Sequence, residues 1–101
     1  MEHIFKALSA SIFRVLLSGW SLNSSSGLYE YSLQLNHVYS PSPDVNPYGA
    51  SVGTPATAAE KKAYGCLEVT AAKLDTSTNI LTLYATKQPE SDFYVLIKGV
   101  D

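Results

Sequence analysis

Short runs of alternating residues constrain the fold of this chain more than any other feature. Between Leu28 and Leu35, every second side chain is apolar or aromatic, and these side chains share one side of an extended backbone: Tyr29, Tyr31, Leu33 and Leu35. A two-residue period predicts a β-strand with one buried face. Similar runs cover residues 67–71, 81–84 and 93–98. The turn sequence LDTSTN and Pro89 separate these runs, so we expect a three-stranded antiparallel meander.

The segment before the first run carries two patterns. Apolar residues recur at helical spacing from Ile4 to Val15, but they alternate from Phe13 to Leu17. We therefore expect a frayed or helical lead-in over residues 1–10, followed by a strand over residues 12–17. The sequence NSSSG favours a turn, so this strand is expected to form a hairpin with the strand 28–35.

Trp20 stands at the end of this first predicted strand. Its side chain is expected to cover one end of the sheet with its indole N–H hydrogen-bonded, and stacking on a ligand is the alternative interpretation.

A long loop and a short helix are expected in the middle of the chain. Residues 39–55 hold four of the five prolines, a composition that predicts no regular element. A helix over residues 55–64 follows, started either by Thr54 and Pro55 or by a capping box of Thr57 with Glu60, and ended by Gly65. The expected fold is mainly β (α+β), a compact antiparallel sheet or sandwich of about five strands with this one helix.

Length, charge and cysteine content limit the classes of function. The 101 residues suit one domain, which we place at residues 11–101. Only 16% of the residues are charged and the net charge is -2, which excludes the basic surface that nucleic acid requires. Glu2 and Arg14 interrupt the N-terminal apolar pattern, so we expect neither a signal peptide nor membrane insertion. The single cysteine, Cys66, is interpreted as a small buried strand residue and not as a reactive thiol.

The sequence offers no convincing catalytic set. His37 precedes Asp44, and a triad with a serine can be drawn, but no nucleophile-elbow pattern accompanies any serine, and a solvated histidine is preferred. No His or Cys pair has metal-ligand spacing, and no glycine-rich phosphate loop occurs. We therefore expect no enzymatic activity, no metal site and no cofactor. Tyr39 and Tyr48, in the predicted loop, are the candidates for contact with a ligand or partner.

Three stretches of the chain form a recognisable combination. They are Gly19-Trp20 with the alternating strand that begins near Tyr29 and the Pro/Asp segment after it, the segment TAAEKKAYGCLEV, and the sequence NILTLYATKQPESDFYVLIKGV. Leu83 to Pro89 is the most specific part. The combination resembles a small domain of structural proteins from tailed bacteriophages and prophages of Gram-positive bacteria. The resemblance covers residues 11–100, and Tyr64 stands where the family pattern has a tryptophan.

The resemblance implies a virion component, such as a fibre, decoration or baseplate-associated module, that works by adhesion or assembly. It implies fold-defining roles for Trp20, Tyr64 and Pro89, and a location in the virion or, during assembly, in the bacterial cytoplasm. The implied partners are other virion proteins or a host cell-surface glycan. The alternatives are a free-standing carbohydrate-binding module that uses Tyr39 and Tyr48, and a prophage-encoded domain of unassigned role.

Self-association is the remaining expectation. The apolar side chains of the lead-in have no counterpart in the resemblance and no evident place in the core: Ile4, Phe5 and Leu8. We expect them at the contact of a homo-oligomer, for which the resemblance implies a trimer.

Overall fold

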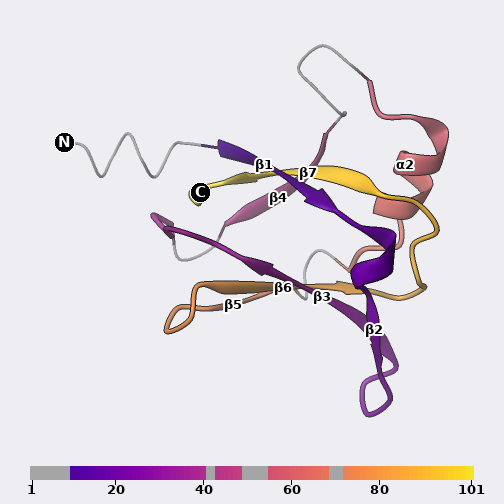
Figure 1. Ribbon diagram of the computed structural model, residues 1–101, viewed down its shortest axis with the longest axis horizontal. Coiled ribbons are helices and arrows are strands. Elements are labelled where there is room, and N and C mark those ends of the chain that lie inside the picture. The colour runs from indigo at the N-terminus through magenta and orange to yellow at the C-terminus, as the bar shows by residue number, and fades with distance from the viewer. Residues whose placement is uncertain (1–9, 41–42, 49–54, 69–71) are drawn as a thin grey trace.

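The chain folds into two antiparallel sheets with one short helix. The computed structural model describes residues 10–40, 43–48, 55–68 and 72–101, and within these ranges there are seven strands (Figure 1). The three-stranded sheet has the order β1 (Ala10–Val15), β7 (Phe93–Lys98), β4 (Asp44–Tyr48). The four-stranded sheet has the order β2 (Ser21–Asn23), β3 (Leu28–Gln34), β6 (Ile80–Ala85), β5 (Lys73–Asp75). A 3-10 turn, η1 (Leu17–Gly19), links β1 to β2, and the helix α2 (Ala58–Tyr64) lies against β7.

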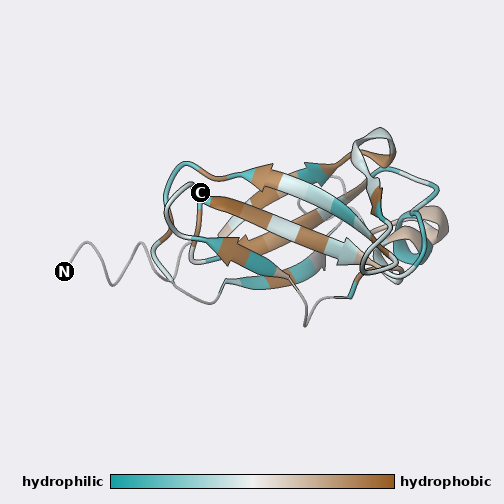
Figure 2. Cartoon of the chain, turned by 90° about the horizontal axis from the view of Figure 1, so that it is seen from below, coloured by the Kyte–Doolittle hydropathy of each residue, from teal (hydrophilic) through white to brown (hydrophobic). Residues whose placement is uncertain are grey.

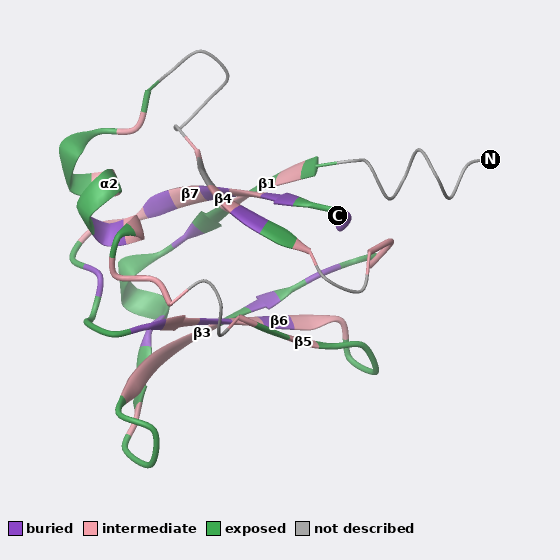
Figure 3. Ribbon diagram, turned by 180° about the vertical axis from the view of Figure 1, so that it is seen from behind, coloured by how far each residue is buried: buried purple, intermediate pink, exposed green. Residues whose placement is uncertain are grey.

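The core lies between the two sheets. Strands β6 and β7 are buried at every second residue (Figure 3). Hydrophobic and hydrophilic residues are interspersed along the strands of the two sheets (Figure 2). Leu33 of β3 and Val15 of β1 complete the same layer, so each sheet has an inner face toward the core and an outer face away from it. Burying a Leu, Val, Ile or Phe side chain contributes about 1.5–3 kcal/mol, which makes this layer the main source of stability.

The mainly β class with one short helix is confirmed, as are the buried faces predicted for residues 28–35 and 93–98. The predicted hairpin has a different first strand. β1 pairs along its whole length with β7 in the three-stranded sheet, and β2 instead forms the hairpin with β3 in the four-stranded sheet. The physical reason is η1, which turns the chain from one sheet to the other before the NSSSG turn. Gly27 takes the positive φ of 75° in that turn.

The predicted three-stranded meander of residues 67–71, 81–84 and 93–98 is wrong. The LDTSTN segment does hold a turn, but the strand before it is β5, which begins at Lys73 and pairs with β6, and β7 leaves β6 and enters the three-stranded sheet. The segment between them contains Pro89, which is fully buried where the chain crosses between the sheets. The strand expected over residues 67–71 is represented by a single bridge between Leu67 and Ala85, and residues 69–71 lie outside the described ranges.

The expectation of no regular structure in residues 39–55 is wrong. β4 lies inside this segment and pairs with β7 from Asp44 to Tyr48, although it contains Pro47. A proline is tolerated in an edge strand, because such a strand needs its N–H groups along one side only.

The helix begins with the capping box and is shorter than expected. The N–H of Glu60 donates to the Thr57 hydroxyl at 3.1 Å, and the Thr57 N–H donates to the Glu60 carboxylate at 2.8 Å. Gly65 follows the helix in right-handed helical conformation, and Ala63 is the residue that the helix buries. Thr54, the alternative cap, lies outside the described ranges.

Candidate binding surfaces

The carboxylate that His37 contacts is Asp101, and not Asp44 as in the triad drawn from the sequence. The Nδ1 of His37 lies 2.9 Å from the carboxylate of Asp101, at the end of the chain, and its ring stacks on Tyr39 with 5.8 Å between centroids. The Asp101 backbone N–H donates to the His37 carbonyl at 3.0 Å. These contacts form a clasp, which holds Asp101 beside the segment that follows β3.

Tyr39 belongs to the same clasp. Its hydroxyl donates to Asp101 at 3.2 Å. Partial burial, the Asp101 charge and this hydrogen bond together raise the pKa of Tyr39 above its ordinary value of 10.0. The Tyr39 hydroxyl is therefore engaged within the protein, and contact of Tyr39 with a ligand stays a prediction.

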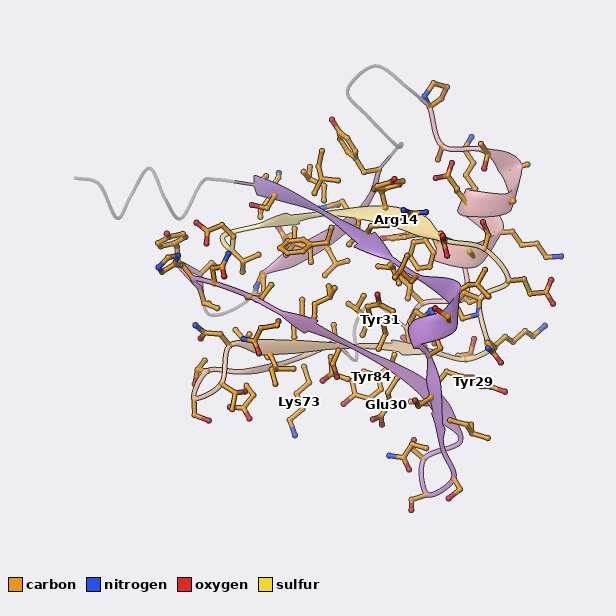
Figure 4. The ribbon with its side chains drawn as sticks, in the orientation of Figure 1. Arg14, Tyr29, Glu30, Tyr31, Lys73 and Tyr84 are labelled. Atoms are coloured by element: carbon orange, nitrogen blue, oxygen red, sulfur yellow. The ribbon has the colours of Figure 1, made fainter. Side chains whose placement is uncertain are left out.

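Tyr48 lies on the outer face of the three-stranded sheet. The β4–β7 register places it opposite Tyr94, and the β1–β7 register places Arg14 on the other side of Tyr94. The three side chains therefore form one row across the sheet. Arg14 projects from this outer face (Figure 4) and donates to Asp92 at 2.9 Å. An aromatic pair next to a guanidinium and a carboxylate can stack on a planar or sugar ring and hydrogen-bond its substituents.

A second exposed surface follows the edge of the sandwich along β1, η1 and β2. It contains the large apolar side chains that remain most exposed among the described residues: Ile12 (43%), Leu16 (40%), Leu17 (42%) and Leu22 (57%). Three of them follow one another within six residues of chain. We call Ile12, Leu16 and Leu17 the β1 apolar strip.

The outer face of the four-stranded sheet is polar. Glu30 of β3 lies opposite Tyr84 of β6, and the Asn23 side chain donates to Glu30 at 2.9 Å. Lys73 of β5 projects from the same side (Figure 4). This face has one aromatic ring among charged groups and no grouping of apolar side chains like that along β1.

A pocket of about 320 Å³ lies between α2 and the segment that crosses to β7. Ala59, Ala63 and Cys66 line it beside charged residues, including Lys62 and Lys87. Cys66 is half-buried beyond the end of α2, with its Sγ 3.5 Å from the Lys62 carbonyl, so its predicted position in a strand is wrong.

The predicted fold-defining residues lie in or beside the core. Trp20 is buried with its ring centroid 5.3 Å from that of Tyr31, but its Nε1 has no hydrogen-bond partner among the described residues, contrary to expectation. Tyr64 packs edge-on against Phe93 and donates to the Val45 carbonyl at 3.4 Å, and burial raises the pKa of Tyr64. The predicted oligomer contacts lie outside the described ranges: Ile4, Phe5 and Leu8.

Two classes of feature are missing from the part of the chain that the structure describes. It contains no grouping of three or more His, Cys, Asp or Glu side chains suited to a metal ion, and none of its helices has the length and apolar character to cross a membrane.

Comparison with protein-family models, with curated proteins and with solved structures found no match to this chain.

Proposed function

We propose that this protein is a non-enzymatic assembly or adhesion module of a phage or prophage virion, which acts by protein–protein contact. The proposal draws on the resemblance in three stretches of the sequence and on one structural observation. That observation is the β1 apolar strip, in which Ile12 of β1 and Leu16 and Leu17, directly after β1, remain exposed. Large apolar side chains that stay exposed close together are typical of surfaces that another protein covers.

Self-association is the form of contact that we propose. With a net charge of -2, like-charge repulsion between copies is weak. The resemblance implies a trimer, whereas the geometry of β1 favours a two-fold contact, as argued in the next subsection. Virion proteins or a host-surface receptor would then bind the assembled form, in the virion or in the bacterial cytoplasm before assembly.

Light scattering coupled to size exclusion tests the proposal on the full chain over a range of micromolar concentrations. We expect a mass that is a multiple of 10.9 kDa and that falls on dilution. A mass of one chain at every concentration would contradict self-association. Recovery of the protein in purified particles, by mass spectrometry, tests the virion assignment separately.

A carbohydrate-binding module is the second candidate, favoured by the row of Arg14, Tyr94 and Tyr48. A glycan array followed by calorimetry on any hit tests it. We expect Tyr94→Ala to abolish glycan binding and Tyr84→Ala, on the opposite outer face, to leave it unchanged. Equal effects of the two substitutions, or no glycan bound, would dismiss this candidate.

A further inference from the structure

We propose that two copies of this chain pair through their β1 strands, antiparallel and across a two-fold axis, so that one sheet runs through both copies. This inference rests on the self-association proposed above. It specifies the surface, the symmetry and the register of the contact.

The edge strands of the two sheets differ in how well they can receive another strand. Unpaired N–H and C=O groups along a sheet edge form a template for a further strand, and proteins commonly obstruct such edges with prolines or make them short. Within the described ranges, β4 carries Pro47, and β2 and β5 are three residues long. β1 has six residues and no proline, and β7 is its one partner among the described strands. β1 is therefore the edge best suited to strand addition (Figure 1).

The β1 sequence is compatible with a second copy of itself. Residues directly opposite one another in an antiparallel pair point to the same face. Ala10, Ile12 and Arg14 are exposed on the outer face, and Ser11, Phe13 and Val15 turn inward. A two-fold pairing that keeps outer faces together must therefore be centred on a residue, either Ile12 or Phe13, and not between two residues.

The exposed side chain of Ile12 favours the register centred on that residue. There, Ile12 lies opposite Ile12 of the partner subunit, so each covers the other's apolar surface. Arg14 lies opposite Ala10 of the partner subunit, and its charge is already paired with Asp92. In this register no two like charges lie opposite one another. The contact also buries apolar surface that is exposed in a single copy.

Disulfide trapping tests the register. Opposite residues in an antiparallel pair have Cα atoms about 4.5–5.5 Å apart, within the range of about 4.4–6.8 Å that a disulfide spans. In a Cys66→Ser background, Ile12→Cys is expected to form a covalent dimer under mild oxidation at micromolar concentration. Leu22→Cys in the same background is the matched control, because Leu22 is more exposed but lies on β2. Equal cross-linking of the two variants would contradict the β1 contact.

Charge repulsion provides the second measurement. Ile12→Lys places two like charges opposite one another at the two-fold axis, and we expect it to raise the dimer dissociation constant at least about tenfold. Leu22→Lys is expected to leave that constant unchanged. Far-ultraviolet circular dichroism verifies that both lysine variants fold. If either of them does not fold, disulfide trapping with Ile12→Cys still tests the β1 contact.

The outcomes separate the two proposals. A parent chain that stays monomeric, with no Ile12→Cys dimer, would overturn both self-association and the β1 contact. A trimer, or a dimer that Ile12→Lys does not weaken, would overturn the β1 contact alone and leave the assembly function in place.

Discussion

The ring of Tyr31 lies directly over the α-carbon of Gly19. A Cβ atom added at Gly19 would overlap Tyr31 Cε2 and lie 2.9 Å from Tyr31 Cδ2. Tyr31 has little freedom to move away, because its ring packs on Trp20 and its hydroxyl accepts the Leu16 N–H at 3.1 Å. The glycine before Trp20 therefore provides the space in which the chain crosses from one sheet to the other.

Replacing this glycine should destabilise the domain. We expect Gly19→Ala to cost about 1–3 kcal/mol, as overpacking does, and to lower the melting temperature by several degrees. Thermal unfolding followed by circular dichroism measures the change. Gly65→Ala is the matched control: Gly65 has a helical φ of -61°, so alanine there should be neutral or stabilise by about 0.4–1 kcal/mol. Equal melting of the two variants would contradict the close approach of Tyr31.

Trp20 should be more important for stability than for binding. Trp20→Ala removes a large buried ring and is expected to cost about 3–5 kcal/mol in urea unfolding. Trp20→Phe should cost less, because it keeps an aromatic ring beside Tyr31 and removes an indole N–H that lacks a partner. Circular dichroism is the suitable signal, since both substitutions remove the tryptophan. Parent-like stability of Trp20→Ala together with lost ligand binding would instead support a functional role.

Local pattern predicts the faces of strands well and their partners poorly. The alternation in residues 93–98 correctly predicted that Phe93, Val95 and Ile97 are buried. The same alternation is satisfied in either sheet, so it carried no information that β7 pairs with β1, at the other end of the chain. The capping box of Thr57 and Glu60 was predictable because all its atoms come from one turn of backbone.

The binding surfaces were less predictable for the same reason. Tyr39 looked free in the sequence, but its partner, Asp101, is the last residue of the chain. Tyr48 was assigned to a loop, and its pairing opposite Tyr94 depends on the register of β4 with β7. The residues of the β1 apolar strip, Ile12, Leu16 and Leu17, are apolar in the sequence, but the sequence does not show that they are exposed. Ile12 is exposed because it lies on the outer face of β1, and Leu16 and Leu17 lie in the segment that leaves the sheet after β1.

A pH-dependent contribution is expected from the turn between β5 and β6. Ser77 donates its hydroxyl at 2.7 Å and its backbone N–H at 3.0 Å to Asp75, and these bonds lower the pKa of Asp75 from its ordinary value of 3.8. A lowered folded-state pKa means that the ionised carboxylate stabilises the fold above pH 3.8. This stability is lost as the pH falls through the folded-state value.

Ser77→Ala tests this contribution, because it removes the hydroxyl donor. The melting temperature of the variant should lie below that of the parent at neutral pH, and the difference should shrink as the pH falls below 3.8. Ser24→Ala, in the turn between β2 and β3, is the control, and its effect should not vary with pH. A Ser77→Ala difference that stays constant down to acid pH would show that Asp75 is not stabilised in this way.

The lead-in is expected to strengthen self-association without being its sole basis. A chain that lacks residues 1–9 should fold with an unchanged melting temperature, because it keeps β1, which begins at Ala10, and every core residue among the described ones. Its dissociation constant should be higher than that of the full chain, since Ile4, Phe5 and Leu8 are removed. Light scattering over a dilution series measures both proteins.

A full-length chain with serine at these three positions is the control that separates apolar contact from chain length, and it should match the truncated chain. If truncation leaves the dissociation constant unchanged, the lead-in contributes nothing and the contact belongs to the β-domain alone. If truncation yields a folded monomer at all concentrations, the contact lies in the lead-in, and the pairing of β1 strands is wrong.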